Sequence, residues 1–241
     1  MTPRPGTDSP EPQTPAAHSP ATGAPATWST VLFDMDGTIV DSVECIGGAL
    51  ELMAEDLGLP APDLSDVTTF MGPPMHDTVE RITGFTDPRQ IDRASARYRA
   101  HHDELEYLVS VYPGMVELIG ELHEAGIAVG VATSKRARIA RRWLTDYHLG
   151  EDVDVIAGAS EDQAGVDKAG IIASALDQLA ELGADTSRTV MVGDRRHDIE
   201  GAASHALEAI YVQWGYGTEA EAASAAYRVK SAAELAALLM G

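Results

Sequence analysis

Cysteine is almost absent from this chain. Cys45 is the only cysteine among 241 residues, so no disulfide bond can form within the chain. Disulfide-rich secreted scaffolds and zinc-ribbon modules, which need several cysteines, are therefore excluded. We expect a protein of a reducing compartment and place it in the cytoplasm.

Positive charge and long apolar runs are also in short supply. Lys and Arg total 17 against 38 Asp and Glu, a formal net charge of -21. A surface of that sign repels phosphate backbones and anionic lipid, so neither nucleic acid nor a membrane is an expected partner. No segment approaches the ~20 apolar residues of a membrane-spanning helix. We expect a small-molecule partner, and the sequence leaves monomer or homodimer open.

Residues 1–27 differ in composition from the rest of the chain. They hold seven of the 13 prolines, among Ser, Thr, Ala and Gly, and have almost nothing to bury. The segment lacks the apolar run of a secretory signal, and its only basic residue is Arg4, unlike an Arg-rich transit peptide. We expect residues 1–27 to form a disordered tail.

From Trp28 onward, short apolar runs alternate with amphipathic segments. Strands are expected at 29–34, 127–133, 153–157, 188–193 and 208–212. Helices are expected at 115–125, 136–147, 168–182 and 197–206. Strands that alternate with helices of this length predict an α/β protein with a doubly wound, Rossmann-like parallel sheet.

Residues 43–112 have another pattern. Apolar residues at helical spacing predict helices at 43–59, around 78–82 and at 89–108, and no strand is evident. The Gly-Pro-Pro at 72–74 is expected to separate two of these helices. The sequence therefore predicts an α/β catalytic core at 28–42 and 113–241, interrupted by a helical cap at 43–112.

Polar side chains gather where the predicted strands end. Ligands of such sheets bind at the carboxyl ends of the strands, so these residues are expected to meet at one site. They are Asp34, Asp36, Thr133, Ser134, Lys135, Lys168, Asp194 and Asp198. Only three of the chain's 17 basic residues are lysines, and two of those three belong to this set.

This set of residue types suits phosphoryl transfer. Of two aspartates two positions apart, one can be a nucleophile while the other moves a proton. Three aspartates in one place repel one another, and a hard cation such as Mg²⁺ would offset that repulsion. Hydroxyl and backbone N–H groups at a helix start can bind phosphate oxygens, and lysine can neutralise their charge.

Four motifs give the chain a resemblance to a known family. DMDGT at 34–38, ATSK at 132–135, Lys168 and GDRRHD at 193–198 resemble the motifs of the haloacid dehalogenase superfamily of phosphohydrolases. The insert between the first two motifs resembles the cap of the phosphoglycolate-phosphatase-like branch, as do the segments at 111–122 and 214–218. This resemblance implies hydrolysis of a phosphate monoester.

The resemblance implies a role for each acid of the first motif. Asp34 would attack phosphorus and become an aspartyl-phosphate. Asp36 would protonate the leaving oxygen and then activate water. Asp34, the backbone carbonyl of Asp36, and Asp194 would coordinate Mg²⁺.

The other motif residues would bind phosphate or position these groups. The resemblance implies that Thr133 and the Ser134 backbone bind phosphate and that Lys168 holds phosphate and nucleophile together. Asp198 would orient Lys168 or a metal-bound water. Lys135 is expected either to reach an anionic substrate or to face solvent.

Several alternatives stay open at this point. A phosphomutase uses the same four motifs and would need basic cap residues for a second phosphate; a non-catalytic member would need to have lost a motif residue. The substrate could be phosphoglycolate, a nucleoside 5′-monophosphate or a sugar phosphate. Residues 195–197 could lie at the site or in a solvated turn. His101 and His102 are adjacent in sequence and do not share a helical face, so no metal site is expected there.

Overall fold

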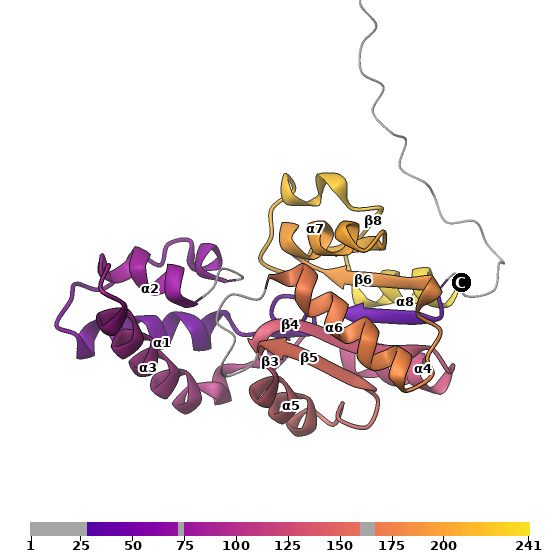
Figure 1. The fold of residues 1–241 in the computed structure, drawn as a ribbon, viewed down its shortest axis with the longest axis horizontal. Helices are drawn as coiled ribbons and strands as arrows, with labels where there is room; N and C mark the ends of the chain where they lie inside the picture. Colours follow the sequence, from indigo (N-terminus) through magenta and orange to yellow (C-terminus); the bar gives the residue numbers. More distant parts are fainter. Residues whose placement is uncertain (1–27, 72–74, 160–166) are drawn as a thin grey trace, which may run out of the picture.

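The computed structural model describes residues 28–71, 75–159 and 167–241, and every structural statement concerns these residues. The predicted tail at 1–27 and the break at 72–74 lie outside them. Figure 1 shows a sheet flanked by helices, with a separate group of helices beside one end of it. None of the described helices is both long and apolar enough to cross a bilayer.

The sheet has six strands, all parallel, in the order β5-β4-β1-β6-β7-β8. The strands are β1 (Thr30–Phe33), β4 (Ala128–Arg136), β5 (Val155–Ala159), β6 (Thr189–Gly193), β7 (Glu208–Val212) and β8 (Tyr227–Val229). The chain builds outward from β1 on one side and returns to build the other side from β6. The predicted doubly wound parallel sheet is thus confirmed, and its order reverses beside β1.

Helices cover both faces of the sheet. One face packs against α4 (Met115–Glu124), α5 (Ala137–Asp146) and α8 (Ala232–Met240), and the other against α6 (Lys168–Glu181) and α7 (Arg196–Ser204). Strand β1 supplies both faces, with Val31 and Phe33 in one apolar cluster and Leu32 in the other. All three side chains are fully buried, as the central strand of a covered parallel sheet requires.

The inserted segment forms its own helical layer. Its elements are α1 (Val43–Asp56), η1 (Val67–Phe70), α2 (Met75–Thr83), α3 (Pro88–Glu104) and η2 (Glu106–Leu108). Helix α3 starts at an N-cap, Asp87, whose side chain accepts a hydrogen bond from Arg89 N, with Pro88 in the first turn. The helices enclose a separate apolar cluster that includes Leu50 and Ile91. We call residues 43–109 the cap.

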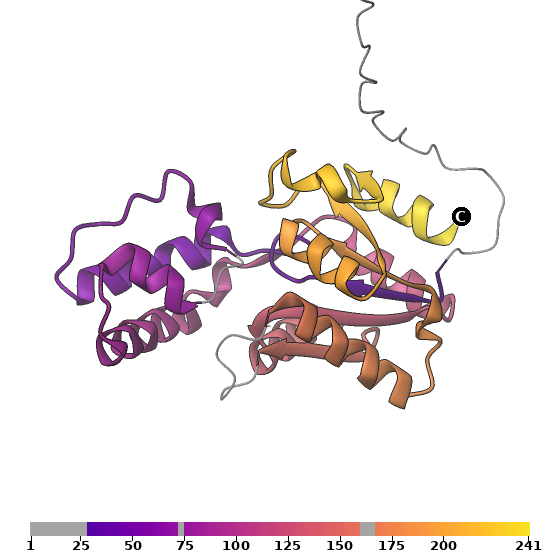
Figure 2. The ribbon, with the colours of Figure 1, turned by 45° about the horizontal axis from the view of Figure 1, so that its top comes forward.

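A short antiparallel ribbon joins the cap to the sheet domain (Figure 2). Strand β2 (Val40–Asp41) pairs with β3 (Ser110–Val111) at the two points where the chain crosses between the parts. The expectation of no strand within 60–112 was therefore wrong at Ser110–Val111. A strand of two residues is too short to show the alternation by which strands are recognised.

Candidate active site

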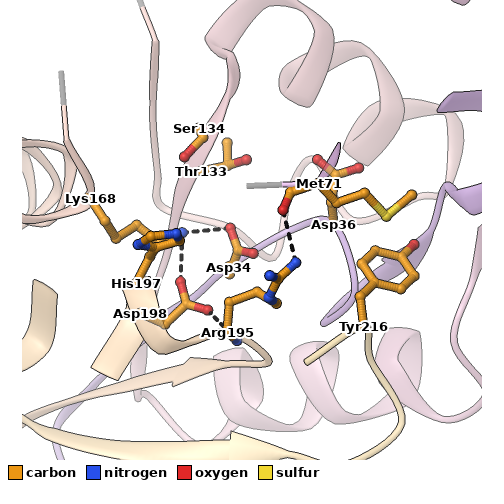
Figure 3. Close-up of a pocket in the computed structure, with 10 residues that line it drawn as sticks. All are labelled: Asp34, Asp36, Met71, Thr133, Ser134, Lys168, Arg195, His197, Asp198 and Tyr216. Atoms are coloured by element: carbon orange, nitrogen blue, oxygen red, sulfur yellow. Dashed lines mark hydrogen bonds and ion pairs between the residues drawn. The ribbon is translucent and has the colours of Figure 1, made fainter. Parts of the chain in front are cut away.

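The carboxyl ends of β1, β4 and β6 meet at a cavity of about 50 Å³ (Figure 3). It is lined by Asp34, Asp36, Met71, Thr133, Ser134, Lys168, Arg195, His197, Asp198 and Tyr216. Of the site residues expected from sequence, only Lys135 and Asp194 are not in this lining, and both contact residues that are. The topology thus brings the predicted set together.

Lys168 lies at the centre of the acidic side of this cavity. Asp167 is the N-cap of helix α6, so Lys168 is the first residue of the helix and lies at the edge of the sheet. Its Nζ is 2.7 Å from Asp34 Oδ1 and 2.8 Å from Asp198 Oδ1, and it donates to Ala132 O at 2.9 Å. The ammonium thus donates two hydrogen bonds and forms an ion pair with Asp198, whose Oδ1 accepts no hydrogen bond from the described residues.

The charges at the site are strongly perturbed by burial. Burial raises the pKa of Asp34 to about 7, although the Lys168 ammonium acts in the opposite direction. Burial and the neighbouring Asp198 also raise the pKa of Asp194 well above its ordinary value. For Lys168, burial disfavours the cation, but Asp198 and Asp34 outweigh it and raise its pKa. One buried cation thus faces three buried carboxyl groups.

The carboxylates of Asp34, Asp194 and Asp198 each offer an oxygen within 4.8 Å of the others. Asp194 Oδ2 accepts from Tyr216 N at 2.6 Å, whereas its buried Oδ1 accepts no hydrogen bond from the described residues. A buried acceptor without a donor is costly, and a cation would satisfy it. Such hard oxygen donors fit Mg²⁺.

Asp194 comes this close to the first motif because of a glycine. Gly37 has φ +84°, a left-handed conformation, and a side chain there would collide with the Asp194 carboxylate. The glycine of the DMDGT segment is therefore needed both for the turn and for the approach of Asp194.

Strand β4 continues past its expected end at Thr133. Thr133 pairs with Gly158 and Arg136 with Ala159, with an irregular register between them. Ser134 lines the cavity within this irregularity, and Thr133 Oγ1 accepts from Lys135 N at 3.1 Å. Such a bulge re-aims side chains. The Lys135 side chain lies outside the lining, and its contact with substrate stays a prediction.

Asp36 is held by residues that the sequence did not single out. Its Oδ1 accepts from Ser42 Oγ at 2.6 Å and lies 3.3 Å from Lys135 Nζ. Ser42 immediately precedes α1, a position typical of a helix N-cap, yet its side chain makes no capping bond. Only the tertiary structure shows that its hydroxyl serves Asp36 instead.

Tyr216 lies in the WGYGT segment. It joins the carboxylates of Asp34, Asp194 and Asp198, which we call the acid cluster, to the β2–β3 ribbon, which we call the hinge ribbon. Its N–H donates to Asp194, and its Oη donates to Asp41 Oδ1 at 3.0 Å and accepts from Ser42 N at 2.7 Å. The sequence marked this segment only through its resemblance to the family. The structure places it beside the cavity and against β2.

The three residues that follow Asp194 differ in their surroundings. Arg195 Nη1 donates to two cap carbonyls, Thr68 O at 3.0 Å and Met71 O at 2.8 Å. His197 also lines the cavity, whereas Arg196 is exposed and pairs with Glu200. Of residues 195–197, Arg195 and His197 therefore lie at the site and Arg196 lies in solvent. Arg195 also connects the sheet domain to the cap.

We expect Arg195→Met to lower kcat/KM about tenfold. The substitution removes the charge-assisted hydrogen bonds that hold the cap segment 68–71 beside the cavity. The measurement is steady-state phosphate release at saturating Mg²⁺. Arg196→Met makes the same substitution at the adjacent, exposed position and serves as the matched control. Equal effects of the two substitutions would show that the cap contact does not matter.

His102 of α3 is buried against β4 and α5. Burial, together with Lys135, Arg136 and Arg142, lowers the pKa of His102 to about 3. The imidazole is therefore neutral at physiological pH. Its Nε2 lies 3.4 Å from Lys135 Nζ, so a cap residue contacts the residue that follows Thr133 and Ser134.

This buried histidine should make stability depend on pH. Below its ordinary pKa near 6.5, His102 binds a proton in the unfolded chain but not in the folded one. The free energy of unfolding should therefore fall by about 2 kcal/mol between pH 7 and pH 5 through this residue. Urea unfolding in chelator at both pH values, compared with His102→Gln, measures it. An equal loss in the variant would contradict the assignment.

Comparison with known proteins agrees with this architecture. A family model described as haloacid dehalogenase-like hydrolase matches residues 31–212. The chain is 38% identical over 188 residues to tyrosine-protein kinase PtkA of Mycobacterium tuberculosis; the match covers 78% of this chain and 62% of the kinase, less than two thirds of its length. It is 31% identical to pyrophosphatase PpaX of Halalkalibacterium halodurans, over 80% of this chain and 86% of that protein.

A solved structure gives the same picture. A putative phosphatase from Clostridium difficile superposes with a TM-score of 0.76 at 31% identity, covering 88% of this chain and 98% of that one. The relatives named pyrophosphatase and phosphatase agree with the predicted hydrolase family, whereas the chain spans less than two thirds of the kinase that it matches. The chain belongs to the haloacid dehalogenase-like hydrolase family, as its four motifs indicated.

Proposed function

We propose that this protein is a Mg²⁺-dependent phosphatase that hydrolyses a small phosphate monoester through a phosphorylated Asp34. The observation that carries the proposal is the buried contact of Lys168 with Asp34 and Asp198, beside the unsatisfied oxygen of Asp194. The pyrophosphatase and the phosphatase structure among the relatives support the reaction class.

The reaction follows from the placement of the two acids. The Asp34 carboxylate attacks phosphorus, and the bond to the ester oxygen breaks as that oxygen takes a proton from Asp36. Water then attacks the phosphorylated Asp34, gives its proton to Asp36, and inorganic phosphate leaves. Both acids line the same cavity, and Lys168 holds one oxygen of Asp34 throughout.

Three groups would hold the cation: the carboxylates of Asp34 and Asp194 and the backbone carbonyl of Asp36. When bound, Mg²⁺ would neutralise charge on the transferred phosphoryl group. Asp198 has another task, because one of its oxygens lies on Lys168 and the other accepts from Arg195 N at 3.0 Å. It orients the lysine and starts helix α7.

The size of the cavity favours a small substrate. A volume of about 50 Å³ is room for about four water molecules at ~10–15 Å³ each, close to one phosphate group. We propose transfer to water rather than to a tyrosine, because relatives are named pyrophosphatase and phosphatase, although PtkA is named a kinase.

The mutase alternative loses support from the cap. Arg81 donates to Thr69 and lies over the Phe70 ring, and Arg97 donates to Asp56. No cap arginine occurs among the described residues that line the cavity. The cationic side chains of the described lining, Lys168 and Arg195, both come from the sheet domain, so the cap supplies no arginine for a second phosphate there. A small phosphate ester as partner and a cytoplasmic location stay predictions.

The test is phosphate release from a panel of phosphoglycolate, pyrophosphate, nucleoside monophosphates and hexose phosphates. We expect EDTA to stop the reaction and Mg²⁺ to restore it, because the acid cluster would then lack its counter-charge. One ester far ahead of the others would identify the substrate. An undiminished rate in chelator would contradict the metal assignment, and label passing from ATP to tyrosine would favour the kinase.

A further inference from the structure

Lys135 has a buried side chain that is not part of the cavity lining. Its side chain is 8% exposed. The ammonium nitrogen lies 3.3 Å from Asp36 Oδ1, 3.4 Å from His102 Nε2 and 4.1 Å from the centre of the Trp143 ring. A buried ammonium needs several partners, and here one is an acid of the reaction and another belongs to the cap.

His102 is built to accept from this lysine. It is neutral, and the ammonium beside Nε2 makes that nitrogen the acceptor and leaves the ring proton on Nδ1. Its ring is stacked on Trp143, with centroids 5.6 Å apart and planes at 10°. The same indole thus supports both Lys135 and His102, which limits the positions that either can take.

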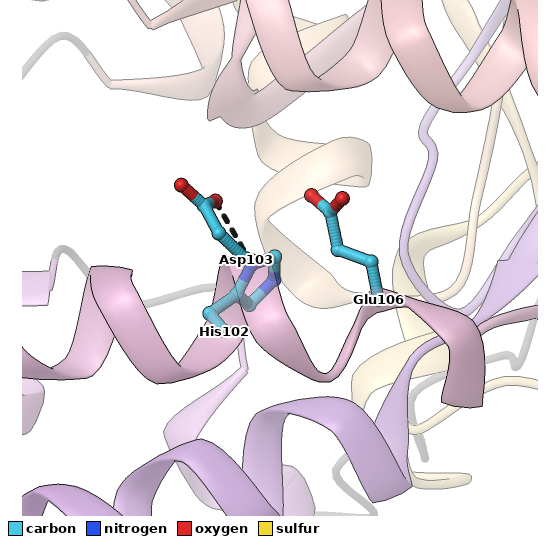
Figure 4. A group of neighbouring side chains, drawn as sticks. All are labelled: His102, Asp103 and Glu106. Atoms are coloured by element: carbon cyan, nitrogen blue, oxygen red, sulfur yellow. Dashed lines mark ion pairs between the residues drawn. The ribbon is translucent and has the colours of Figure 1, made fainter.

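The end of α3 that carries His102 is anchored to the sheet domain. His102, Asp103 and Glu106 lie close together, and the two carboxylates project from the same stretch of chain (Figure 4). Their cation is already present, because the guanidinium of Arg142 on α5 contacts Asp103 and Glu106. These ion pairs attach the end of α3 to α5 and so fix the position of His102.

The contacts of Lys135 and His102 restrain the side chain of Asp36. Its Oδ1 is shared by Ser42 Oγ and Lys135 Nζ, both on one side of the carboxylate. With one oxygen held in this way, the other is left for proton exchange in the cavity that Asp36 lines. Rotation of Asp36 would break the contact with Lys135, and Lys135 is restrained by His102.

We propose that Lys135 and His102 are positioning residues for proton transfer: Lys135 holds Asp36 in its working orientation, and His102 of the cap holds Lys135. The inference rests on the proposed function, in which Asp36 gives its proton to the leaving oxygen and later regains one from water. It assigns the cap a part in the chemistry beyond covering the cavity.

The test compares two esters that differ in their need for a proton. The leaving group of an alkyl phosphate must be protonated, whereas p-nitrophenolate leaves without a proton. We expect Lys135→Met and His102→Leu to lower the alkyl-to-aryl ratio of kcat/KM about tenfold, a fraction of the whole acid–base contribution. His102→Gln, whose amide oxygen can accept from Lys135, should restore the ratio. Lys230→Met, at the exposed third lysine, is the control for charge.

Two kinetic outcomes would overturn the proposal. An equal fall with both esters would mean a general loss of structure, and a rise in KM alone would mean that Lys135 binds substrate. If the wild type hydrolyses neither ester, the proposed function fails. Crystal structures of the wild type and of His102→Leu with Mg²⁺ then test the positioning role separately, through the contact between Lys135 and Asp36. Lys135 leaving Asp36 in the variant supports the positioning role; an unchanged contact refutes it. Circular dichroism melts show whether each variant folds.

Discussion

Replacing Asp34 with asparagine is expected to abolish phosphate release, with kcat reduced by more than about a hundredfold. A neutral amide oxygen is a poor nucleophile, and the other carboxyl groups of the lining are already engaged: Asp36 by Ser42 and Lys135, and Asp198 by Lys168 and Arg195 N. The amide has the same shape and can still accept from Lys168, so the fold should persist. Steady-state kinetics on the best ester of the panel measures the loss.

The stability of the same variant makes the test specific. Asp34 is buried beside Asp194 and Asp198, and its removal lowers the repulsion among them. In chelator, Asp34→Asn should therefore melt no earlier than the wild type. Asp63→Asn, the same change at an exposed cap position, should alter neither kinetics nor melting. Retention of more than about a hundredth of the wild-type rate would contradict the nucleophile assignment.

Replacing Lys168 with methionine is expected to destroy activity and also to destabilise the protein. Methionine keeps the length of the side chain but leaves Asp34 and Asp198 buried without their cation. Breaking a buried ion pair in this way costs about 3–5 kcal/mol. Urea unfolding in chelator and phosphate release with Mg²⁺ measure the two effects, with Lys230→Met as the control.

A second substitution separates charge from packing in this result. If the loss comes from unpaired carboxylates, adding Asp198→Asn to Lys168→Met should recover part of the stability, because one of the two charges is then gone. If the loss comes from packing, the double variant should be no more stable than the single one. A Lys168→Met protein as stable as the wild type in chelator would refute the ion-pair argument.

Much of this architecture was predictable because its signals are local. Each strand that reaches the site ends in polar residues, and parallel strands bring their carboxyl ends to one edge. Asp34, Thr133 and Asp194 could therefore be grouped from sequence. Strand β8 was not predicted, because a three-residue strand within an alanine-rich segment has no readable period. Helix α8 was missed although Leu235, Leu238 and Leu239 follow helical spacing.

The contacts around Asp36 could not be predicted, because they join distant segments. Nothing in the sequence relates Ser42 or His102 to an acid of the first motif, and the hydroxyl of Ser42 would be assigned to a helix cap. Lys135 was expected at the substrate or in solvent. In the structure its ammonium lies beside Asp36 and His102, after an irregular register of β4 that depends on pairing with β5, and its contact with substrate stays a prediction.

Tyr216 is a single residue that contacts both the acid cluster and the hinge ribbon. Its backbone N–H binds Asp194 and its hydroxyl binds Asp41, so a movement of β2 that shifts the ring also shifts the donor at Asp194. Equilibria that share a residue in this way are linked, and linkage is reciprocal. If closure of the cap tightens the hold of this cluster on a cation by some factor, the cation favours closure by the same factor.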